Sequence, residues 1–306
     1  MNYIFIVNPH ARTGLGGVTW DLIEPELKKR RIAYSTYITE KSGHAEKIAR
    51  EITADGKEHT IVVLGGDGTV NEVLNGMKDP GKITLGYIPI GSSNDFARGL
   101  GIRKEPLEAL EVVLAGKKTV ELDVGVISRN GKKRKFAVSA GIGFDAGVCH
   151  QVCISRWKIL LNKLNLGKLS YAVVALDRLI KCRPAAMSVQ VDGGKEERFQ
   201  KVYFAAFMNL PCEGGGFRFC PKALPSDGKL DLLVAADVSK LKVLLLLPVA
   251  LLGRHTGFRG VTLRRGSRIR VRSEKPLPIH TDGEPLFLRR EAEAYTGEEK
   301  IRVITG

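Results

Sequence analysis

A glycine-rich loop directly follows a short apolar run near the start of the sequence. Residues 61–64 read Ile-Val-Val-Leu, residues 65–69 read Gly-Gly-Asp-Gly-Thr, and an amphipathic segment comes next. Three glycines in four positions allow positive φ angles and a close approach of the backbone to a ligand, and Thr69 is a candidate N-cap for the following helix. Because the free N–H groups at a helix N-terminus bind phosphate oxygens, the loop predicts a phosphate cradle.

A carboxylate in this loop indicates that a cation takes part. No lysine follows the last glycine, so the loop is not a Walker A loop, and Asp67 would repel a bare phosphate. Mg²⁺ between the carboxylate and the phosphates removes that repulsion. The loop therefore favours binding of a nucleotide through Mg²⁺ and backbone amides, with an ordinary tight turn as the alternative.

Two further loops follow predicted strands. Residues 87–98 (YIPIGSSNDFAR) offer Ser92 to a phosphate and Asp95 to a metal or a water, and residues 8–17 (NPHARTGLGG) are rich in glycine. Since the carboxyl ends of parallel strands converge on one crevice, all three loops are expected to face one ligand. Taken alone, residues 92–95 are also consistent with a simple helix N-cap.

Two more carboxylates lie close together in residues 280–285 (HTDGEP). On a rigid turn, Asp282 and Glu284 can act as a general base and a metal partner, although surface Asp-Gly turns are common. None of the motifs contains a Ser-His or Cys-His pair. Direct phosphoryl transfer, without a covalent enzyme intermediate, is therefore the predicted chemistry.

The elements that must position these loops change character near residue 122. Before it, β-rich runs alternate with amphipathic runs, which is the pattern of βαβ units. The predicted strands are 3–8, 34–39, 60–64, 84–88 and 118–124, and the predicted helices are 20–31, 44–54, 70–77 and 106–115. This part is predicted to be an α/β domain with a mostly parallel sheet.

Strand-like runs bounded by turn signals dominate the rest of the chain. The predicted strands are 136–140, 188–191, 202–208, 230–235, 268–273 and 277–281. Two helical segments, 146–181 and the Leu-rich 241–252, interrupt them. An antiparallel sheet or sandwich is the prediction for this part.

The composition is that of a globular protein with a large basic excess. The chain has 306 residues, enough for two domains, with 43% hydrophobic residues and a formal net charge of +15. Such an excess attracts polyanions: nucleic acid, an anionic membrane or a phosphorylated small molecule. Aromatic residues are only 7%, and no nucleic-acid motif accompanies the basic runs. Five scattered cysteines, no secretory leader and no apolar stretch long enough to span a bilayer predict a cytoplasmic protein.

The loops together, in this order and spacing, resemble the catalytic domain of the diacylglycerol kinase family, which includes sphingosine and ceramide kinases and soluble bacterial lipid kinases. The resemblance rests on residues 8–16, 65–71, 89–98, 140–145, 214–216, 226–231 and 282–284. It departs from the family at Ser92-Ser93, where Thr-Gly is usual, and a hydroxyl is kept.

The resemblance implies a fold of two domains. An α/β nucleotide-binding domain of the Rossmann-like, NAD-kinase-like type covers residues 1–122 and is joined by the C-terminal residues 290–306. An antiparallel β-sandwich that binds the lipid covers residues 123–289, with the active site in the cleft between the two.

The resemblance also assigns roles to residues. Those expected to contact ATP are Asn8, Pro9, His10, Ala11, Arg12, Thr39, Gly65, Gly66, Asp67, Gly68, Thr69, Val70, Asn71 and Ser92. Asp67 and Asp95 are expected to order catalytic Mg²⁺ and water, with Asp282 beside them, and Glu284 is the expected base. A structural metal is implied at Asp227 and the carbonyls of Leu224 and Lys229.

The implied function is an ATP- and Mg²⁺-dependent lipid kinase that acts on diacylglycerol or another lipid alcohol, such as phosphatidylglycerol or a sphingoid base. It would work peripherally at the anionic inner face of the membrane, and a homodimer stays open. Basic residues at 129–135 and 254–272 and the apolar helix at 241–252 are candidate membrane contacts, with a core helix as the alternative for the last. NAD kinase, which shares the Gly-Gly-Asp-Gly loop, and an inactive nucleotide-binding regulator are the rival functions.

Overall fold

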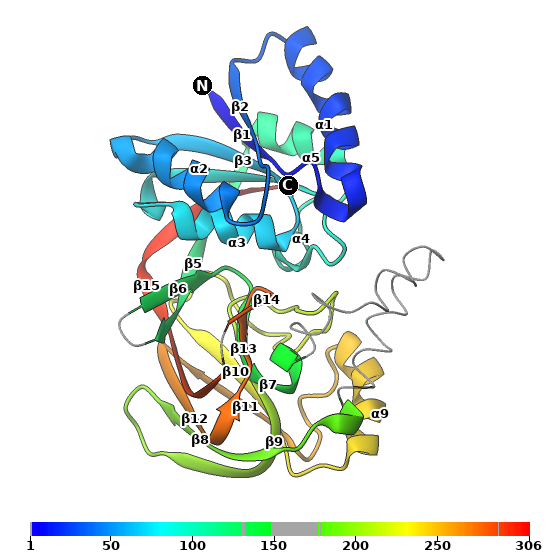
Figure 1. Ribbon diagram of the computed structural model, residues 1–306, viewed down its shortest axis with the longest axis vertical. Helices are drawn as coiled ribbons and strands as arrows, with labels where there is room; N and C mark the ends of the chain where they lie inside the picture. The colour runs from blue at the N-terminus through cyan, green and yellow to red at the C-terminus, as the bar shows by residue number, and fades with distance from the viewer. Residues whose placement is uncertain (1, 130–131, 148–176, 178, 287) are drawn as a thin grey trace.

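The apolar runs in the first part of the chain form four parallel strands, as Figure 1 shows for the computed structural model. The strands are β1 (Tyr3–Val7), β2 (Tyr34–Ile38), β3 (His59–Gly65) and β4 (Ile83–Pro89). They pair in the order β2-β1-β3-β4. The structure describes all residues except 1, 130–131, 148–176, 178 and 287.

Helices cover both faces of this sheet. They are α1 (Ala11–Lys29), α2 (His44–Ile52), α3 (Asp67–Gly76), α4 (Asp95–Leu100) and α5 (Pro106–Ala115), with 3₁₀ turns η1 (Thr53–Asp55) and η2 (Pro80–Lys82). In β3, Ile61 and Val63 pack in the cluster of α2 and α3, whereas Val62 and Leu64 pack in the cluster of α1 and α5. A strand that is covered on both faces reads as an unbroken apolar run. The predicted α/β domain is confirmed.

Two helices begin earlier than predicted. The first was expected from residue 20, but α1 begins at Ala11 and is kinked where Arg12 and Thr13 take φ angles of 48° and 61°. Helix α3 was expected from residue 70 with Thr69 as its cap, but it begins at Asp67 and its N-cap is Gly66. Both differences lie in glycine-rich segments, where low helix propensity hides a helix that tertiary contacts stabilise.

The second part of the chain is an antiparallel β-sandwich, also as predicted. Its elements are β6 (Lys132–Phe136), β7 (Ser139–Gly143), β8 (Ala185–Val191), β9 (Glu197–Met208), β10 (Leu230–Ala236), α9 (Lys240–Leu251), β11 (Val261–Gly266), β12 (Arg268–Leu277), β13 (Ile279–Thr281) and β14 (Glu284–Pro285). Its core contains Phe136 and Phe207 among aliphatic side chains. Most of the predicted helix 146–181 lies outside the described residues.

One predicted strand, 136–140, is interrupted. Strand β6 ends at Phe136 and β7 begins at Ser139, because the N–H groups of Ala137 and Val138 point to a side chain instead of a neighbouring strand. The acceptor is Asp282.

Two long strands connect the domains: β5 (Lys118–Arg129) and β15 (Arg289–Thr305). They pair antiparallel along most of their length, and β15 also pairs with β12 of the sandwich and, at Arg302 and Val303, in parallel with β4. The chain therefore passes between the domains along a hydrogen-bonded ribbon (Figure 1).

Candidate active site

A cavity of about 470 Å³ opens at the carboxyl ends of the parallel strands. Its lining residues are Asn8, His10, Ala11, Arg12, Thr39, Lys41, Ser42, Ala45, Gly66, Gly68, Thr69, Glu72, Gly91 and Glu284. Eight of the residues expected to contact ATP are among them, and so is the expected base. The crevice at the carboxyl ends of an open sheet is the usual ligand site of such folds.

The glycines of the phosphate loop are required by close contacts with neighbouring atoms and not by unusual dihedral angles. Neither Gly65, Gly66 nor Gly68 has a positive φ, contrary to the expectation. A Cβ at Gly65 would lie 2.6 Å from the Thr69 Oγ1, and one at Gly66 would lie 3.2 Å from the Cα of Gly91. Bare backbone is therefore needed because neighbouring groups occupy the space of a side chain.

The first turn of α3 is fixed to β1 by a side-chain bond. Asn8 Nδ2 donates to the Thr69 Oγ1 at 3.0 Å. Gly66, Gly68 and Thr69 line the cavity, so the positive end of the α3 dipole faces it. Nearby, Arg12 also lines the cavity with its backbone in the left-handed region, a strained conformation that tertiary contacts must hold.

Asp67 and Asp95 form a buried carboxylate pair beside this turn. Asp67 accepts the N–H groups of Asp95 (3.0 Å) and Phe96 (3.1 Å) and so caps α4. Asp95 accepts from Arg98 at 2.5 Å and from the Gly215 N–H at 2.7 Å. Burial raises the pKa of Asp67 to about 7, and the charge of Asp95 adds to the rise. Burial also raises the pKa of Asp95, although hydrogen bonds from Gly215 and Arg98 oppose it.

Of the two carboxylates, Asp95 pairs with Arg98, whereas Asp67 accepts from backbone N–H groups. Oxygen donors of this kind fit a hard divalent cation such as Mg²⁺. Asp67 lies between the cavity-lining Gly66 and Gly68, so a cation held by the carboxylate pair would be close to a phosphate bound in the cavity.

A tight hairpin turn brings the sandwich to α3. Asp282 and Gly283 have φ angles of 48° and 80° and connect Thr281 to Glu284, the pattern of a two-residue type I′ turn. Glu284 is exposed and lines the cavity, and its Oε1 would lie 2.6 Å from a Cβ at Gly68. Because Gly68 has no side chain, the Glu284 carboxylate can lie against the N-terminus of α3.

Asp282 has a different environment from the one expected. Its Oδ2 accepts from Ala137 N and Asn71 Nδ2, and its Oδ1 accepts from the N–H groups of Val138 and Ser139, at 2.8–3.0 Å. With four donors on its two oxygens, Asp282 positions the hairpin, and the geometry gives no support to a metal partner or catalytic group there.

Several residues expected to contact ATP lie elsewhere. Val70 is in the core under the sheet, and Asn71 joins the domains by donating to Asp282 and accepting from Arg134 at 2.8 Å. Those expected residues that do not line the cavity are Pro9, Gly65, Asp67, Val70, Asn71 and Ser92.

Three polar cavity residues were missed by the sequence analysis: Lys41, Ser42 and Glu72. Glu72 accepts from the N–H of Gly43 at 2.8 Å and from Ser42, and so holds the turn after β2. A Lys-Ser-Gly turn after a parallel strand was the available signal.

A second polar cluster lies under the hairpin. His280 Nε2 is 3.2 Å from Asp145 Oδ2 and 3.1 Å from Glu213 Oε1, and its Nδ1 accepts the Gly283 N–H at 3.2 Å. Since Nδ1 is an acceptor, Nε2 carries the proton and has no lone pair for a metal. Burial raises the pKa of Glu213, although His280 opposes the rise. The cluster therefore supports the turn as a hydrogen-bonded unit.

The turn of Leu224, Asp227 and Lys229, expected to hold a structural metal, contains two side-chain cations. The Lys300 ammonium donates to a backbone carbonyl of the turn at 2.8 Å, and Arg265 lies 3.5 Å from the Asp227 Oδ2. The other Asp227 oxygen accepts the Lys229 N–H at 3.1 Å. These contacts engage the Asp227 carboxylate and the Ser226 carbonyl, and the metal site at Leu224, Asp227 and Lys229 stays a prediction.

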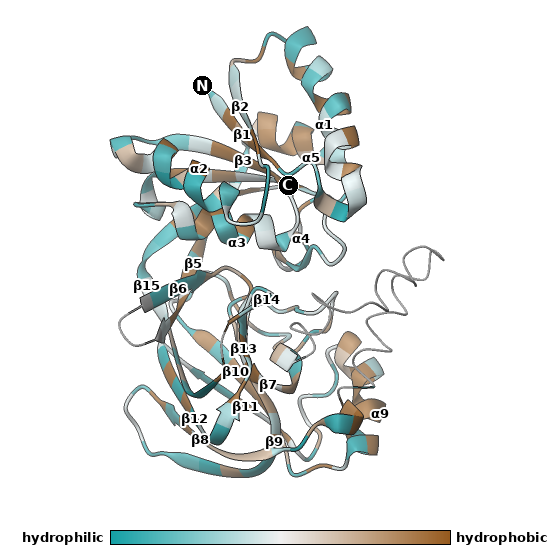
Figure 2. Cartoon of the chain, viewed as in Figure 1, coloured by the Kyte–Doolittle hydropathy of each residue, from teal (hydrophilic) through white to brown (hydrophobic). Residues whose placement is uncertain are grey.

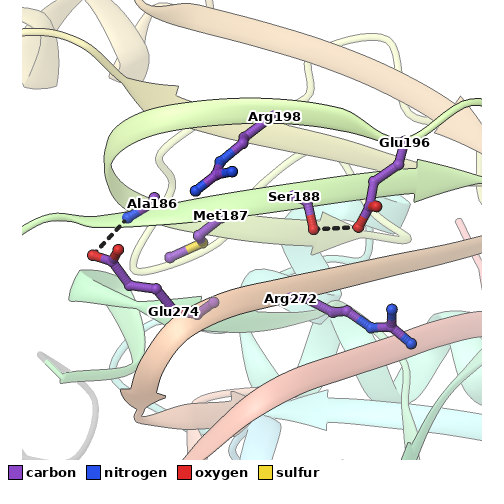
Figure 3. Close-up of a pocket in the computed structure, with 8 residues that line it drawn as sticks. Ala186, Met187, Ser188, Glu196, Arg198, Arg272 and Glu274 are labelled. Carbon is purple, nitrogen blue, oxygen red and sulfur yellow. Dashed lines mark hydrogen bonds between the residues drawn. The ribbon is translucent and has the colours of Figure 1, made fainter.

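A separate hollow of about 310 Å³ lies on the sandwich between β8, β9 and β12 (Figure 3). Its carboxylates are already engaged: Glu274 accepts the Ala186 N–H at 3.1 Å and Glu196 accepts from Ser188. None of the expected site residues lines it, so we place the chemistry in the larger cavity.

Comparison with known proteins shows the family of the chain. Residues 2–127 match the family described as the diacylglycerol kinase catalytic domain, and residues 137–289 match the YegS C-terminal NAD kinase beta sandwich-like domain. The chain belongs to the diacylglycerol kinase catalytic-domain family. It is a kinase enzyme, and its curated relatives are named as lipid kinases.

Two relatives and two solved structures show how far the similarity extends. A presumed lipid kinase, YtlR, of Bacillus subtilis (strain 168) is 33% identical over 92% of this chain and 93% of its own. The diacylglycerol kinase of the same organism is 31% identical over 82% and 78%. A presumed diacylglycerol kinase from Bacillus anthracis str. Sterne has the same fold, with a TM-score of 0.77 at 22% identity over 100% of this chain and 97% of that one. An NAD kinase from Archaeoglobus fulgidus in complex with ATP has a TM-score of 0.54 at 13% identity over 100% and 94%.

Proposed function

We propose that this lipid kinase uses ATP and Mg²⁺ to phosphorylate the free hydroxyl of diacylglycerol, which yields phosphatidic acid. The observation that carries the proposal is the position of Glu284. A carboxylate from the sandwich lies against Gly68 at the N-terminus of α3, so a base and a phosphate-binding turn share one cavity.

Different residues of the chain have separate roles in an in-line transfer of the γ-phosphoryl group. The first turn of α3 holds phosphate oxygens through its N–H groups, and Glu284 takes the proton of the acceptor hydroxyl. A bond forms between the acceptor oxygen and the γ-phosphorus, the bond from that phosphorus to the bridging oxygen breaks, and ADP leaves. Mg²⁺, which Asp67 and Asp95 would hold, neutralises charge on the phosphates when bound.

The test is a Glu284→Gln variant with labelled ATP and a panel of acceptors: diacylglycerol, phosphatidylglycerol, a sphingoid base and NAD⁺. Loss of a general base lowers kcat by about 100-fold or more, while the KM for ATP changes by less than about threefold. Glu298→Gln, an exposed carboxylate on β15, is the matched control and keeps full activity. A normal kcat in Glu284→Gln would refute the role of Glu284 as the general base. If the enzyme prefers another acceptor of the panel, that acceptor replaces diacylglycerol as the proposed substrate.

A diacylglycerol acceptor lies in a bilayer, so we further propose that the enzyme works peripherally at an anionic membrane surface, at the inner face. The formal net charge of +15 supports this. No described helix has the length and apolar character needed to cross a membrane.

A further inference from the structure

Helix α9 presents leucines to solvent instead of to the core. The exposed fractions are 65% for Leu241, 64% for Leu245 and 67% for Leu252, and Leu244 and Leu251 are exposed as well. Spacings of three, four and seven residues place these side chains on one helix face, which we call the leucine stripe. The buried residues of α9 are Val243 and Ala250, so only a narrow face packs on the sandwich. This helix is therefore not the core helix that its composition allowed. Figure 2 shows α9 as a largely hydrophobic helix at the edge of the sandwich.

The charged side chains on α9 and in the segment that follows it have one sign. Residues 238–260 contain Lys240, Lys242, Arg254 and Arg259 but neither Asp nor Glu. Within the described part of the chain, Lys242, Arg254 and Arg259 form no ion pair. An exposed apolar helix with unpaired cations on it and in the segment that follows it is complementary to an anionic lipid surface.

Many cations of the other basic segments expected to face a membrane have partners within the protein. In 129–135, Arg134 pairs with Glu46 at 3.0 Å and Lys135 donates to the carbonyl of Met77 at 2.9 Å, so both side chains point to the α/β domain.

In 261–272 each arginine has a carboxylate partner. The pairs are Arg264 with Glu197, Arg265 with Asp231, Arg268 and Arg270 with Glu293, and Arg272 with Glu291. Paired arginines have less charge to offer a membrane, so the unpaired cations near α9 are the better contacts.

One short segment connects α9 to the catalytic carboxylates. The Gly215 N–H donates to Asp95 at 2.7 Å, and three residues later the Arg218 N–H donates to the carbonyl of Ala250 in α9 at 3.0 Å. Three residues span at most about 11 Å of chain. The end of the leucine stripe is thus one short loop away from Asp95.

We propose that the leucine stripe of α9 inserts into the surface of an anionic bilayer and that the 215–218 loop places the active site against that surface. The lipid acceptor is then reached without leaving the bilayer. Only this last step rests on the proposed function, because docking itself does not depend on catalysis.

The experiment compares two double variants by sedimentation with vesicles of phosphatidylcholine, with and without phosphatidylglycerol. Leu241→Ser/Leu245→Ser removes part of the stripe. Val18→Ser/Leu22→Ser on α1 is the matched control, with the same spacing and exposed fractions of 58% and 59%. We expect the α9 variant to lose about tenfold or more in binding to anionic vesicles and the control to bind like the wild type.

A third variant tests the charge. Lys242→Gln/Arg254→Gln/Arg259→Gln should lose binding to anionic vesicles. Added salt should weaken the vesicle binding of the wild type toward the level of this variant. Unchanged thermal midpoints show that all variants fold. The proposal is wrong if the α9 and α1 variants sediment alike, or if the α9 variant only turns a dimer into a monomer in analytical ultracentrifugation while vesicle binding is unchanged.

Activity separates docking from chemistry. The α9 variant should lose turnover of diacylglycerol in vesicles but keep turnover of a short-chain diacylglycerol that is dissolved as monomers. If the wild type phosphorylates neither, the proposed function fails, whereas the sedimentation result still decides the docking proposal.

Discussion

Replacing Asp282 with Asn should destabilise the protein far more than the same change in another Asp-Gly turn. Each carboxylate oxygen of Asp282 accepts two N–H groups, and in Asn an NH₂ group replaces one of these oxygens. Because NH₂ donates and cannot accept, two hydrogen bonds to a charged acceptor are lost. Such bonds contribute about 1.5–3 kcal/mol each, which gives a loss of about 3–6 kcal/mol. Burial raises the pKa of Asp282, so removal of its charge also relieves a desolvation cost. We therefore expect the lower end, about 3 kcal/mol.

The assay is urea unfolding followed by circular dichroism, with kinase turnover as a second measurement. Asp192→Asn is the matched control, since Asp192 also precedes a glycine in a turn and has a φ of 49°. Its Oδ1 accepts from Ser267 and from the Arg268 N–H, and an Asn Oδ1 keeps both bonds. We expect a change within about 0.5 kcal/mol for the control. Equal destabilisation by the two variants would refute the role assigned to the four donors.

Two further predictions concern the catalytic loop and a buried histidine. Gly68→Ala should lower kcat about tenfold or more without loss of stability, because a Cβ displaces the Glu284 carboxylate. The control in the same turnover assay is Gly81→Ala, where the added Cβ would lie 3.4 Å from the nearest atom, the Asp79 Oδ1. Burial lowers the pKa of His255, although the hydrogen bond from Nε2–H to the Phe219 carbonyl opposes the fall, and Nδ1 has no partner among the described residues. As the pH falls from about 7 to about 5, the unfolded chain takes up this proton first, so stability falls. Thermal melts of His255→Asn should show a smaller fall, and an equal fall would contradict the prediction.

The parts of the fold that sequence could predict are those set by local apolar patterns. Residues 61–64 are apolar at every position and form a strand that is buried on both faces. The Asp282-Gly283 pair is a turn signal and forms a tight turn. In both cases nearby residues alone determine the backbone.

The parts that could not be predicted depend on distant residues. Helix α1 begins inside a glycine-rich segment, and β6 ends because Asp282, far along the chain, takes the N–H groups of residues 137–139. From the sequence, the leucines of α9 allow either a membrane contact or a core helix, because the sequence does not show whether an apolar helix face packs against another element of the fold. Asp67 was predicted beside phosphates, but its bonds to the start of α4 need two loops to be brought together.

The position of β15 has a consequence for how the protein is made. Its last residues lie between β4 and β5, so an inner strand of the first domain's sheet comes from residues that follow the whole sandwich in the sequence. Translation delivers residues 3–123 long before Arg302 and Val303. Until those two residues are synthesised, β4 has an open edge that can pair with a wrong strand. The sheet of the α/β domain is thus completed only after the sandwich has been translated, and a gene fragment that stops after β5 encodes a sheet without one of its inner strands.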